Sequence, residues 1–419
     1  MAAPAPRAHG RAAFLFIFIT VSLDMLALGV CAPVLPRLVV QFNRGDIAEA
    51  ASINGLFGLA FASMQFLFSP LLGALSDRFG RRPLLLLSNL GLGADYLLMA
   101  LAPSLGWLFV GRVISGITAS SWSLGSAYVA DITPEGERAK KFGMLAAAFG
   151  LGFVIGPSLG GLLGTVDLRL PFWASAGLSL ANFAYGFFVL PESLPASQRA
   201  RLDLKKANPV GALRLLGSHP ELLGLGLATF LYYLAHVALP AVFVLYTMHR
   251  YGWTERLTGL SLAAVGVTSI IVGAVLVGPV VKRLGDRRGL LLGLGMATIG
   301  FLTYALAGST AAFMAGIPIT ALMGLVGPTN NALMTRRVGP SEQGALQGAL
   351  GSLRGITEMM GPVIFNGSLS WSIHTRAEAP LNGAPFLLAG GMLALSAVIS
   401  WRATAGAGDA LPATTTTTS

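Results

Sequence analysis

Apolar runs of about 20 residues recur along almost the whole chain, separated by short polar segments. A run of that length, coiled into a helix, spans the hydrocarbon core of a bilayer. Only helices and closed barrels can cross lipid, because every backbone polar group must be satisfied internally, and these runs are too long for barrel strands. Charged residues make up only 11% of the chain, whereas a soluble domain contains roughly a quarter. The sequence therefore predicts an all-α polytopic membrane protein.

The apolar runs predict twelve transmembrane helices in two halves of six. The first run is too long for a signal-peptide core and lacks a small-residue cleavage site, so we expect it to remain as a helix. The expected spans lie near residues 12–36, 50–74, 83–102, 106–130, 142–164, 170–190, 221–246, 256–281, 288–308, 312–336, 342–366 and 382–402. The expected parts are an N-terminal tail at 1–11, a first half at 12–190, a linker at 191–220, a second half at 221–402 and a disordered, threonine-rich C-terminal tail at 403–419.

Positive charge divides unequally between the two sides of the predicted membrane protein. Of the 28 lysines and arginines, 20 fall on segments that face the same side as the termini, and Arg112 and Arg354 fall inside helices. The other six are Arg37, Arg44, Arg169, Arg250, Arg256 and Arg376, all on opposite loops. Since basic segments stay in the cytoplasm, we expect both termini to be cytoplasmic and the protein to lie in the cell membrane. The net charge of +10 has the same origin and does not indicate nucleic acid.

An internal repeat with an offset of 205 residues supports the two halves. It aligns Gly80 with Gly285, and the same offset serves a second, distant region of the chain. Lys282 stands where the first half has Asp77, so we expect a strong charged contact in the first half only. The offset also pairs Gly73 with Gly278, Arg78 with Arg283, Arg82 with Arg287, Gly143 with Gly348, Gly150 with Gly355, and Gly156-Pro157 with Gly361-Pro362.

The most specific stretch runs from Gly73 to Pro83 and reads G-x-L-S-D-R-x-G-R-R-P. Charged residues cannot lie in hydrocarbon, so this must be an interfacial loop, in which Gly80 supplies a backbone geometry that few other residues tolerate. Its charged residues are Asp77, Arg78, Arg81 and Arg82. Three arginines alone would fit a solvated hairpin equally well. The full string closely resembles the loop between helices 2 and 3 of major facilitator transporters, especially the tetracycline-efflux branch of the drug/proton antiporters.

A second string, Gly152-Phe-Val-Ile-Gly156-Pro157-Ser-Leu-Gly160-Gly161, lies in the fifth expected span. Glycines four apart form a smooth face for close helix contact, and Pro157 bends the helix. The string resembles the antiporter motif of drug exporters, which implies export by exchange.

The segment from Ala130 to Arg138 resembles the end of helix 4 in the tetracycline-efflux branch. We expect Asp131 to pair with an arginine of the Gly73–Pro83 stretch, Arg81 being the favoured one, when the cytoplasmic side is shut.

Five charged residues fall inside expected spans, where charge is expensive and usually functional: Asp24, Asp95, Arg112, Arg354 and Glu358. Asp24 and Asp95 each lie about 12 residues into their helix, roughly 18 Å along its axis. Burial disfavours a charged carboxylate and a nearby cation favours it again, so such a group could load and release a proton. A fixed ion pair that orients helices is the alternative for both.

Arg112 lies in Gly111-Arg-Val-Ile-Ser-Gly-Ile-Thr, which resembles the helix-4 arginine motif that the superfamily associates with proton coupling. Its guanidinium stays charged, so it could hold a carboxylate ionised until substrate disturbs the pair; a packing role is the alternative. Arg354 and Glu358 are four residues apart and share a helix face. They could neutralise each other, or Glu358 could be a proton or substrate carboxylate of the second half. This pair is foreign to the tetracycline-efflux pattern.

The resemblance implies that substrate is held near the midplane between the halves. Polar residues on the helices that line this cavity in the superfamily could contact substrate or could join helices instead. They are Gln65, Tyr232, Tyr233, His236, Asn330, Asn331 and Gln347. Tetracycline exporters carry a histidine in helix 8 and an acid in helix 9, near Ser269 and Ala297 here. Neither their proton route nor their substrate therefore carries over directly.

We therefore expect a monomeric, proton-coupled antiporter in the lipid bilayer that exports a drug-like or tetracycline-like small molecule by alternating access. The alternatives are a facilitator or symporter of a sugar-like or organic metabolite and, less favoured, a non-transporting receptor or scaffold. No cofactor and no metal are expected. Cys31 is the only cysteine, and the sequence has no His/Glu metal spacing, nucleophile elbow or phosphate-binding loop. An enzyme or an ATP-driven pump is therefore not indicated.

Overall fold

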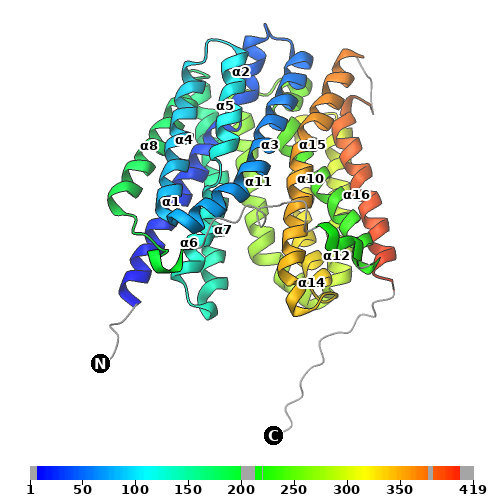
Figure 1. The fold of residues 1–419 in the computed structure, drawn as a ribbon. Helices are drawn as coiled ribbons and strands as arrows, with labels where there is room; N and C mark the ends of the chain where they lie inside the picture. Colours follow the sequence, from blue (N-terminus) through cyan, green and yellow to red (C-terminus); the bar gives the residue numbers. More distant parts are fainter. Residues whose placement is uncertain (1–6, 200–212, 219, 376–380, 406–419) are drawn as a thin grey trace, which may run out of the picture. The chain divides into compact units, whose positions relative to one another are not determined.

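The computed structural model describes residues 7–199, 213–218, 220–375 and 381–405, which form helices joined by short connections (Figure 1). The threonine run at the C-terminus lies outside the described residues. The α-helices are α1 (Arg7–Cys31), α2 (Leu35–Phe42), α3 (Ile47–Phe79), α4 (Arg81–Leu101), α5 (Leu105–Thr118), α6 (Ser121–Ile132), α7 (Glu135–Gly164), α8 (Leu170–Val189), α9 (Arg214–Ser218), α10 (Pro220–Tyr251), α11 (Glu255–Ile271), α12 (Val277–Leu306), α13 (Thr310–Ala321), α14 (Val326–Thr335), α15 (Gln343–His374) and α16 (Ala384–Ala403). Short 3₁₀ or π segments lie at Ala196–Gln198, Val272–Leu276, Leu322–Leu325, Pro340–Glu342 and Leu381–Gly383.

Nine helices within the described part of the chain are long and apolar enough to cross a membrane. One of them, Glu255–Leu306, is 52 residues long and covers two expected spans. The chain leaves helical geometry at Gly285, which lies between these two spans. The two expected spans outside these nine correspond to α5 with α6 and to α15. A count of twelve crossings fits these helices and stays a prediction. α1 begins at Arg7, inside the expected N-terminal tail.

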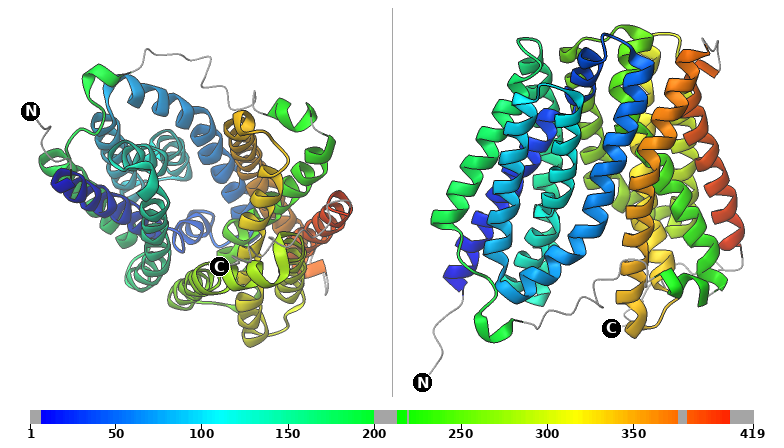
Figure 2. Two further views of the ribbon diagram at one scale, coloured as in Figure 1. Left: turned by 90° about the horizontal axis from the view of Figure 1, so that it is seen from below. Right: turned by 45° about the horizontal axis from the view of Figure 1, so that its top comes forward.

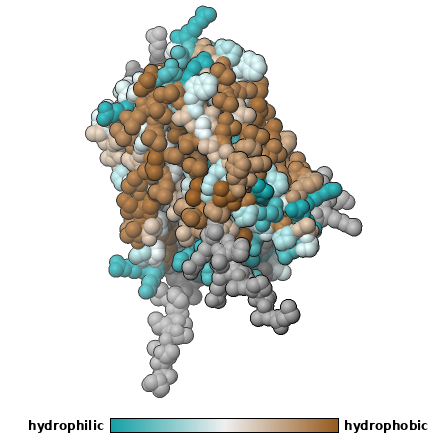
Figure 3. Space-filling model, turned by 90° about the vertical axis from the view of Figure 1, so that its left-hand side faces the viewer, coloured by the Kyte–Doolittle hydropathy of each residue, from teal (hydrophilic) through white to brown (hydrophobic). Residues whose placement is uncertain are grey.

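The surface bears the marks of a lipid-facing protein. On the face shown in Figure 3, apolar side chains form a broad belt, with polar residues gathered at its two ends. Large apolar side chains such as Leu87, Phe187 and Phe188 are exposed. In water such a belt would be unstable, whereas hydrocarbon solvates it.

The expected fourth and tenth spans are not continuous helices. The fourth span breaks between α5 and α6, and the tenth span breaks at the 3₁₀ turn between α13 and α14. The 205-residue offset carries Ala119, in the first break, onto Gly324, in the second. The amide of Gln65 donates to the Ala119 carbonyl at 3.1 Å, and the Ser88 hydroxyl donates to the Thr118 carbonyl. Polar side chains thus satisfy the carbonyls that the first break frees, as a buried break requires.

The chain divides into two compact units. Unit 1 comprises residues 1–209, 239–267 and 358–377, and unit 2 comprises residues 210–238, 268–357 and 378–419. Unit 1 thus adds the later parts of α10 and α15, and most of α11, to the whole first half. In unit 1, α1 packs against α7 and α8, and α4 packs against α8 and α5 (Figures 1 and 2).

Each unit has its own apolar core. In unit 1, Ile17, Val21, Leu85 and Tyr128 are fully buried within one cluster. In unit 2, α12 packs against α13, α14 and α16. Its core is a set of buried aromatic rings whose centroids lie 4.6–6.1 Å apart: Phe301, Tyr304, Phe313 and Phe386.

Candidate functional site

The Gly73–Pro83 stretch, expected to be an interfacial loop, leaves the helix only at a one-residue turn. α3 runs to Phe79 and α4 begins at Arg81, so Gly80 alone joins them. Gly80 has φ 106° and ψ 158°, a region that only glycine occupies freely. The repeat-related Gly285 adopts the same geometry, with φ 76° and ψ 169°. Most of the motif therefore lies in helix: Gly73, Asp77 and Arg78 in α3, and Arg81, Arg82 and Pro83 in α4.

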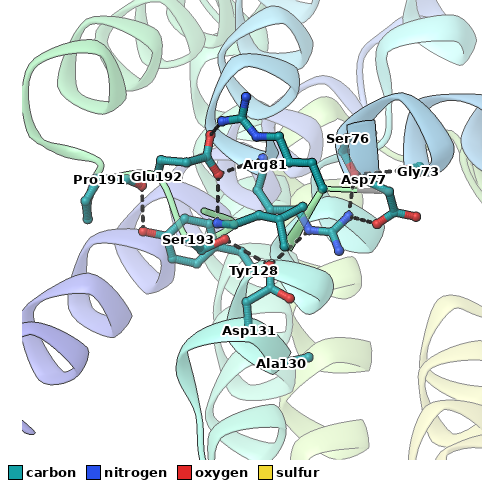
Figure 4. Close-up of polar contacts among 12 residues, drawn as sticks. Gly73, Ser76, Asp77, Arg81, Tyr128, Ala130, Asp131, Pro191, Glu192 and Ser193 are labelled. Carbon is teal, nitrogen blue, oxygen red and sulfur yellow. Dashed lines mark hydrogen bonds and ion pairs between the residues drawn. The ribbon is translucent and has the colours of Figure 1, made fainter. Parts of the chain in front are cut away.

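Four charged residues at this turn contact one another, and together with Gly80 we call them the Gly80 latch: Asp77, Arg81, Asp131 and Glu192 (Figure 4). Arg81 Nη1 lies 2.5 Å from Asp77 Oδ1, and Arg81 Nε lies 3.0 Å from Asp131 Oδ2. The side chains of Arg81 and Asp131 are only 11% and 20% exposed, so water weakens this ion pair less than it weakens a surface pair. The contact expected between Asp131 and Arg81 is present. Its role in gating stays a prediction.

The two other arginines of the motif take separate partners. Arg78 is exposed and lies over the Phe79 ring, 5.3 Å from its centroid. Arg82 donates to the Phe187 carbonyl at 2.5 Å and so holds α4 to α8.

Glu192 completes the latch, and the sequence analysis did not single it out. It lies in Pro191-Glu-Ser193, just after α8, and its Oε1 accepts from the Arg81 backbone N–H at 2.8 Å. A carboxylate there caps the N-terminus of α4, where the helix dipole favours negative charge. The Tyr128 hydroxyl donates to the Pro191 carbonyl at 2.9 Å, and the Ser193 hydroxyl donates to Asp131 at 3.0 Å (Figure 4). The available signal was a Pro-Glu-Ser sequence directly after an apolar helix.

The second half carries its own ion pair at the equivalent place, with reversed polarity. Arg336 Nη2 lies 2.7 Å from Asp286 Oδ2 within unit 2. The 205-residue offset carries Arg81 onto Asp286 and Asp131 onto Arg336. The offset also places Lys282 at the position of Asp77, so all three charges of this contact change sign between the halves. A charged contact is thus present in the second half as well, because exchanging both partners preserves the attraction. Arg336 is 68% exposed, so the expectation that the strong contact belongs to the first half stays a prediction.

Asp24 lies in the middle of α1 and is 2% exposed. Its Oδ1 accepts from the Asn182 amide of α8 at 3.2 Å. The Asn89 amide of α4, turned with its nitrogen toward Asp24, lies 3.1 Å from Oδ2. Neutral donors from two helices therefore surround this carboxyl, so a proton could be bound or lost without breaking an ion pair.

Asp95 and Arg112 lie on α4 and α5, two helices that pack against each other. Asp95 is fully buried and accepts from the Ser115 hydroxyl. Its Oδ1 has no hydrogen-bond partner among the described residues. The Arg112 guanidinium lies over the Phe61 ring, 4.3 Å from its centroid, and its charge acts on Asp95. The arrangement places a permanent cation near a carboxyl that it does not clamp.

The glycine string of α7 is pressed between two helices of unit 1. A methyl group on Gly156 would lie 2.6 Å from Gly29 Cα in α1, and one on Gly161 would lie 2.6 Å from the Glu255 carbonyl in α11. Gly152 and Gly160 also face α1 at contact distance, whereas the Pro157 carbonyl meets Gly259 of α11. The motif therefore lets helices from both sequence halves approach as closely as backbone permits.

A buried cluster around Arg37 lies at the end of unit 1 opposite to Gly80, since α3, with 33 residues, separates them by roughly 50 Å. We call it the Arg37 latch: Arg37, Trp253, Glu255 and Thr258. Arg37 Nη1 lies 2.9 Å from Glu255 Oε1, and its Nη2 donates to the Trp253 carbonyl and, at 3.2 Å, to Thr258 Oγ1. From the sequence, Arg37 was expected only as a loop charge, because its partners are about 218 positions away.

Six of the seven expected substrate-contact residues lie in unit 2, and five of these line one cavity. Tyr232, Tyr233, Asn330, Asn331 and Gln347 line a cavity of about 320 Å³, together with Arg354. His236 stacks on Tyr232, with ring centroids 6.2 Å apart and planes 8° apart. Gln65 lies in unit 1 at the break between α5 and α6. Glu358 follows Arg354 on α15 but belongs to unit 1.

Within the described ranges, no group of three or more histidine, cysteine, aspartate or glutamate side chains could hold a metal ion. The buried thiol of Cys31 donates to the Ser175 hydroxyl at 3.2 Å.

The chain is similar to known membrane transporters. The profile of the Major Facilitator Superfamily matches residues 17–362. The class C tetracycline resistance protein of Escherichia coli is 36% identical over 379 residues, 90% of this chain and 93% of that protein. The class G tetracycline resistance protein of Vibrio anguillarum is 35% identical, over 85% and 90% of the two chains. The crystal structure of a human organic anion transporter matches with a TM-score of 0.68 at 24% identity, over 93% and 99%.

Proposed function

Because the chain belongs to the Major Facilitator Superfamily and is a multi-pass membrane transporter, we propose that it is a proton-coupled antiporter exporting a drug-like small molecule. The resemblance seen in the Gly73–Pro83 stretch is confirmed at the level of family. The proposal goes further and names the coupled ion, the direction of transport and the class of substrate. Its support comes from charged residues buried in the first half.

The observation that carries the proposal is Asp24, a buried carboxyl in mid-helix held by the amides of Asn89 and Asn182. An amide can donate to a carboxylate or accept from a carboxylic acid after its own reorientation, so both protonation states find partners. A purely structural ion pair would have placed a cation against the carboxyl. Neutral partners instead favour a group that exchanges a proton during the cycle.

Asp95 and Arg112 supply the second element of coupling. One oxygen of Asp95 is held by Ser115, and the other has no hydrogen-bond partner among the described residues. We propose that Arg112 stabilises the ionised form of Asp95 in one state and that substrate or helix movement weakens this effect in the other. Proton uptake and substrate release would then be linked.

The two latches of unit 1 provide contacts that alternating access would have to break in turn. The Arg37 latch joins the first half to α11, and the Gly80 latch joins α3, α4 and α6 at the opposite end. A shift of a two-state equilibrium from 1:99 to 99:1 needs about 5.5 kcal/mol, so a few half-buried contacts suffice to bias it. We propose that the Gly80 end faces the cytoplasm, as the distribution of positive charge predicts.

The names of the relatives suggest tetracycline as a first substrate to test. Ser269 and Ala297 occupy the places where tetracycline exporters carry a histidine and an acid, so the proton route here would run through the first half. Facilitated diffusion or symport of an organic metabolite is the competing function. It is favoured by the absence of the exporters' histidine and acid at Ser269 and Ala297.

The test is proton movement in inverted vesicles energised to an acid interior. Tetracycline added to wild-type vesicles should trigger proton release, and Asp24→Asn should abolish it at matched protein levels. Glu137→Gln, a neutralised exposed acid in the first turn of α7, is the matched control and should behave as wild type. Substrate that accumulates or equilibrates without any pH change would refute antiport and leave a facilitator or symporter.

A further inference from the structure

The residues that line the cavity of unit 2 restrict the chemical class of ligand that it can bind. It lies between α10, α14 and α15 and measures about 320 Å³, enough for a small fused-ring molecule. Neither latch takes part in it. Its walls divide into an aromatic side, an amide side and one charged group.

The aromatic side comes from consecutive tyrosines of α10. The rings of Tyr232 and Tyr233 have centroids 5.3 Å apart and planes tilted by 46°, and both residues line the cavity. His236 stacks on Tyr232 one turn farther along the helix. Such a wall favours a flat aromatic body, because offset-stacked or edge-on ring contacts add to the apolar area that is buried.

The amide side is held in place by its own hydrogen bonds. The Asn330 amide donates to Thr229 Oγ1 at 2.8 Å, and the Thr229 hydroxyl donates to the Leu225 carbonyl. The Gln347 amide donates to Asn331 Oδ1 at 2.9 Å, which leaves the N–H groups of Asn331 available as donors. A ligand oxygen would meet donors already oriented on this side.

The charged group is Arg354. Of the described residues that line the cavity, it is the one that carries a charge. It is exposed although it lies 11 residues into α15, roughly 16 Å along the helix. With Gln347 and Gly351 it forms one face of α15 toward the cavity. Its guanidinium therefore lies at the cavity wall, at a depth where charge is costly and usually functional.

We propose that this cavity binds a planar aromatic anion, with its acidic oxygens held by Arg354 and its ring against Tyr232 and Tyr233. A guanidinium presents paired donors that match the two oxygens of a carboxylate. The inference rests on the proposed transport function, because the cavity is taken as a substrate site.

Binding is tested with three probes that share one ring system and differ in charge: anthracene-2-carboxylate, anthracene-2-carboxamide and 2-(aminomethyl)anthracene. Titration of purified protein in detergent, read by tyrosine quenching, gives the three dissociation constants. Wild type should bind the carboxylate at least about tenfold more tightly than the amide, and the ammonium most weakly, since only the carboxylate can accept charge-assisted hydrogen bonds as an anion. Arg354→Gln should remove this order, and Arg354→Lys should keep it in weaker form.

Two further variants separate recognition from structure. Arg402→Gln removes an exposed arginine at the end of α16 and should leave all three constants unchanged. If Arg354 serves only to neutralise Glu358, the double variant Arg354→Gln/Glu358→Gln should restore the wild-type order. That result, or equal binding of the three probes by wild type, overturns the proposal.

Binding in detergent involves no gradient, so its outcome is independent of proton coupling. Loss of the charge preference with intact antiport overturns this inference alone. An intact preference without any pH signal in vesicles overturns antiport and leaves the anion site standing.

Discussion

Two glycines at equivalent places in the repeat share a backbone geometry and differ in their surroundings. Gly80 and Gly285 both lie at positive φ with extended ψ, a region nearly closed to side chains. A methyl group on Gly80 would also overlap Glu192 Oε2, whereas one on Gly285 would meet no atom within 4 Å. The pair therefore separates the cost of backbone strain from the cost of a displaced helix cap.

Alanine at these positions should destabilise the protein unequally. Gly285→Ala should cost about 1–3 kcal/mol of backbone strain. Gly80→Ala should cost that and in addition about 1 kcal/mol from the lost cap on α4. Thermal unfolding of purified protein in detergent should give an apparent Tm that falls from wild type to Gly285→Ala to Gly80→Ala. Equal Tm values for the two variants would contradict the role given to Glu192.

At the scale of elements, the repeat preserves contacts while exchanging their chemistry. Each half joins two helices next to a one-residue glycine turn by an ion pair, Arg81 with Asp131 and Asp286 with Arg336. In each half the span that leads to the second residue of the pair is also broken. The break lies at Ala119 in the span before Asp131 and at Leu322–Leu325 in the span before Arg336. The geometry of the pair is thus shared between the halves, and the sign of each charge is not.

The reversed pair predicts a rescue by charge exchange. Asp286→Arg should lower transport, because it sets two cations against each other at the contact between α12 and α14. Asp286→Arg/Arg336→Asp should recover a large part of it, and adding Lys282→Asp, which copies the polarity of the first half, should recover more. Substrate-driven pH change in vesicles measures all three. A double variant no better than the single one would show that the pair does not act as a pair.

At the scale of the whole molecule, unit 1 is closed at the end that holds Arg37 by segments from both sequence halves. Arg37 is 6% exposed and reaches three groups between Trp253 and Thr258. The glycine face of α7 presses on α1 and α11 in the same region. Removing one partner of a buried ion pair costs about 3–5 kcal/mol, which is large enough to change which state is populated.

Cys31 reports on this end of unit 1, because it is the chain's only cysteine and its thiol is buried against Ser175. Arg37→Gln should raise the rate of thiol alkylation by N-ethylmaleimide by about tenfold or more, since a shift of 1.4 kcal/mol toward an open state already gives a factor of ten. Arg44→Gln, at an exposed turn before α3, is the matched control and should label at the wild-type rate. Unchanged labelling in Arg37→Gln would mean that the cluster does not hold this end closed.

Local chemistry made much of this protein predictable from its sequence. Apolar run length predicted the spanning helices, and the 205-residue offset predicted an internal repeat, whose two glycine turns share one backbone geometry. The residue types at Gly80, Asp131 and Gly156 predicted a turn, an ion pair and a close helix contact, each of which is present. The turn and the small-residue helix face follow from residue types and spacings within one helix or at its end, which a sequence displays directly. The ion pair between Arg81 and Asp131 joins residues 50 positions apart, and it was expected because both segments resemble a known family.

Tertiary structure decided the partners. Glu192 meets Arg81 across 111 positions, and Glu255 meets Arg37 across 218, so no local pattern connects them. The pair at Asp286 does not show in the aligned repeat, because its two charges are exchanged and the fold preserves only the attraction between opposite charges. Which polar residues share a cavity likewise depends on how α10, α14 and α15 pack. The sequence by itself thus determined the helices and their turns, and packing over long sequence distances determined which charges meet.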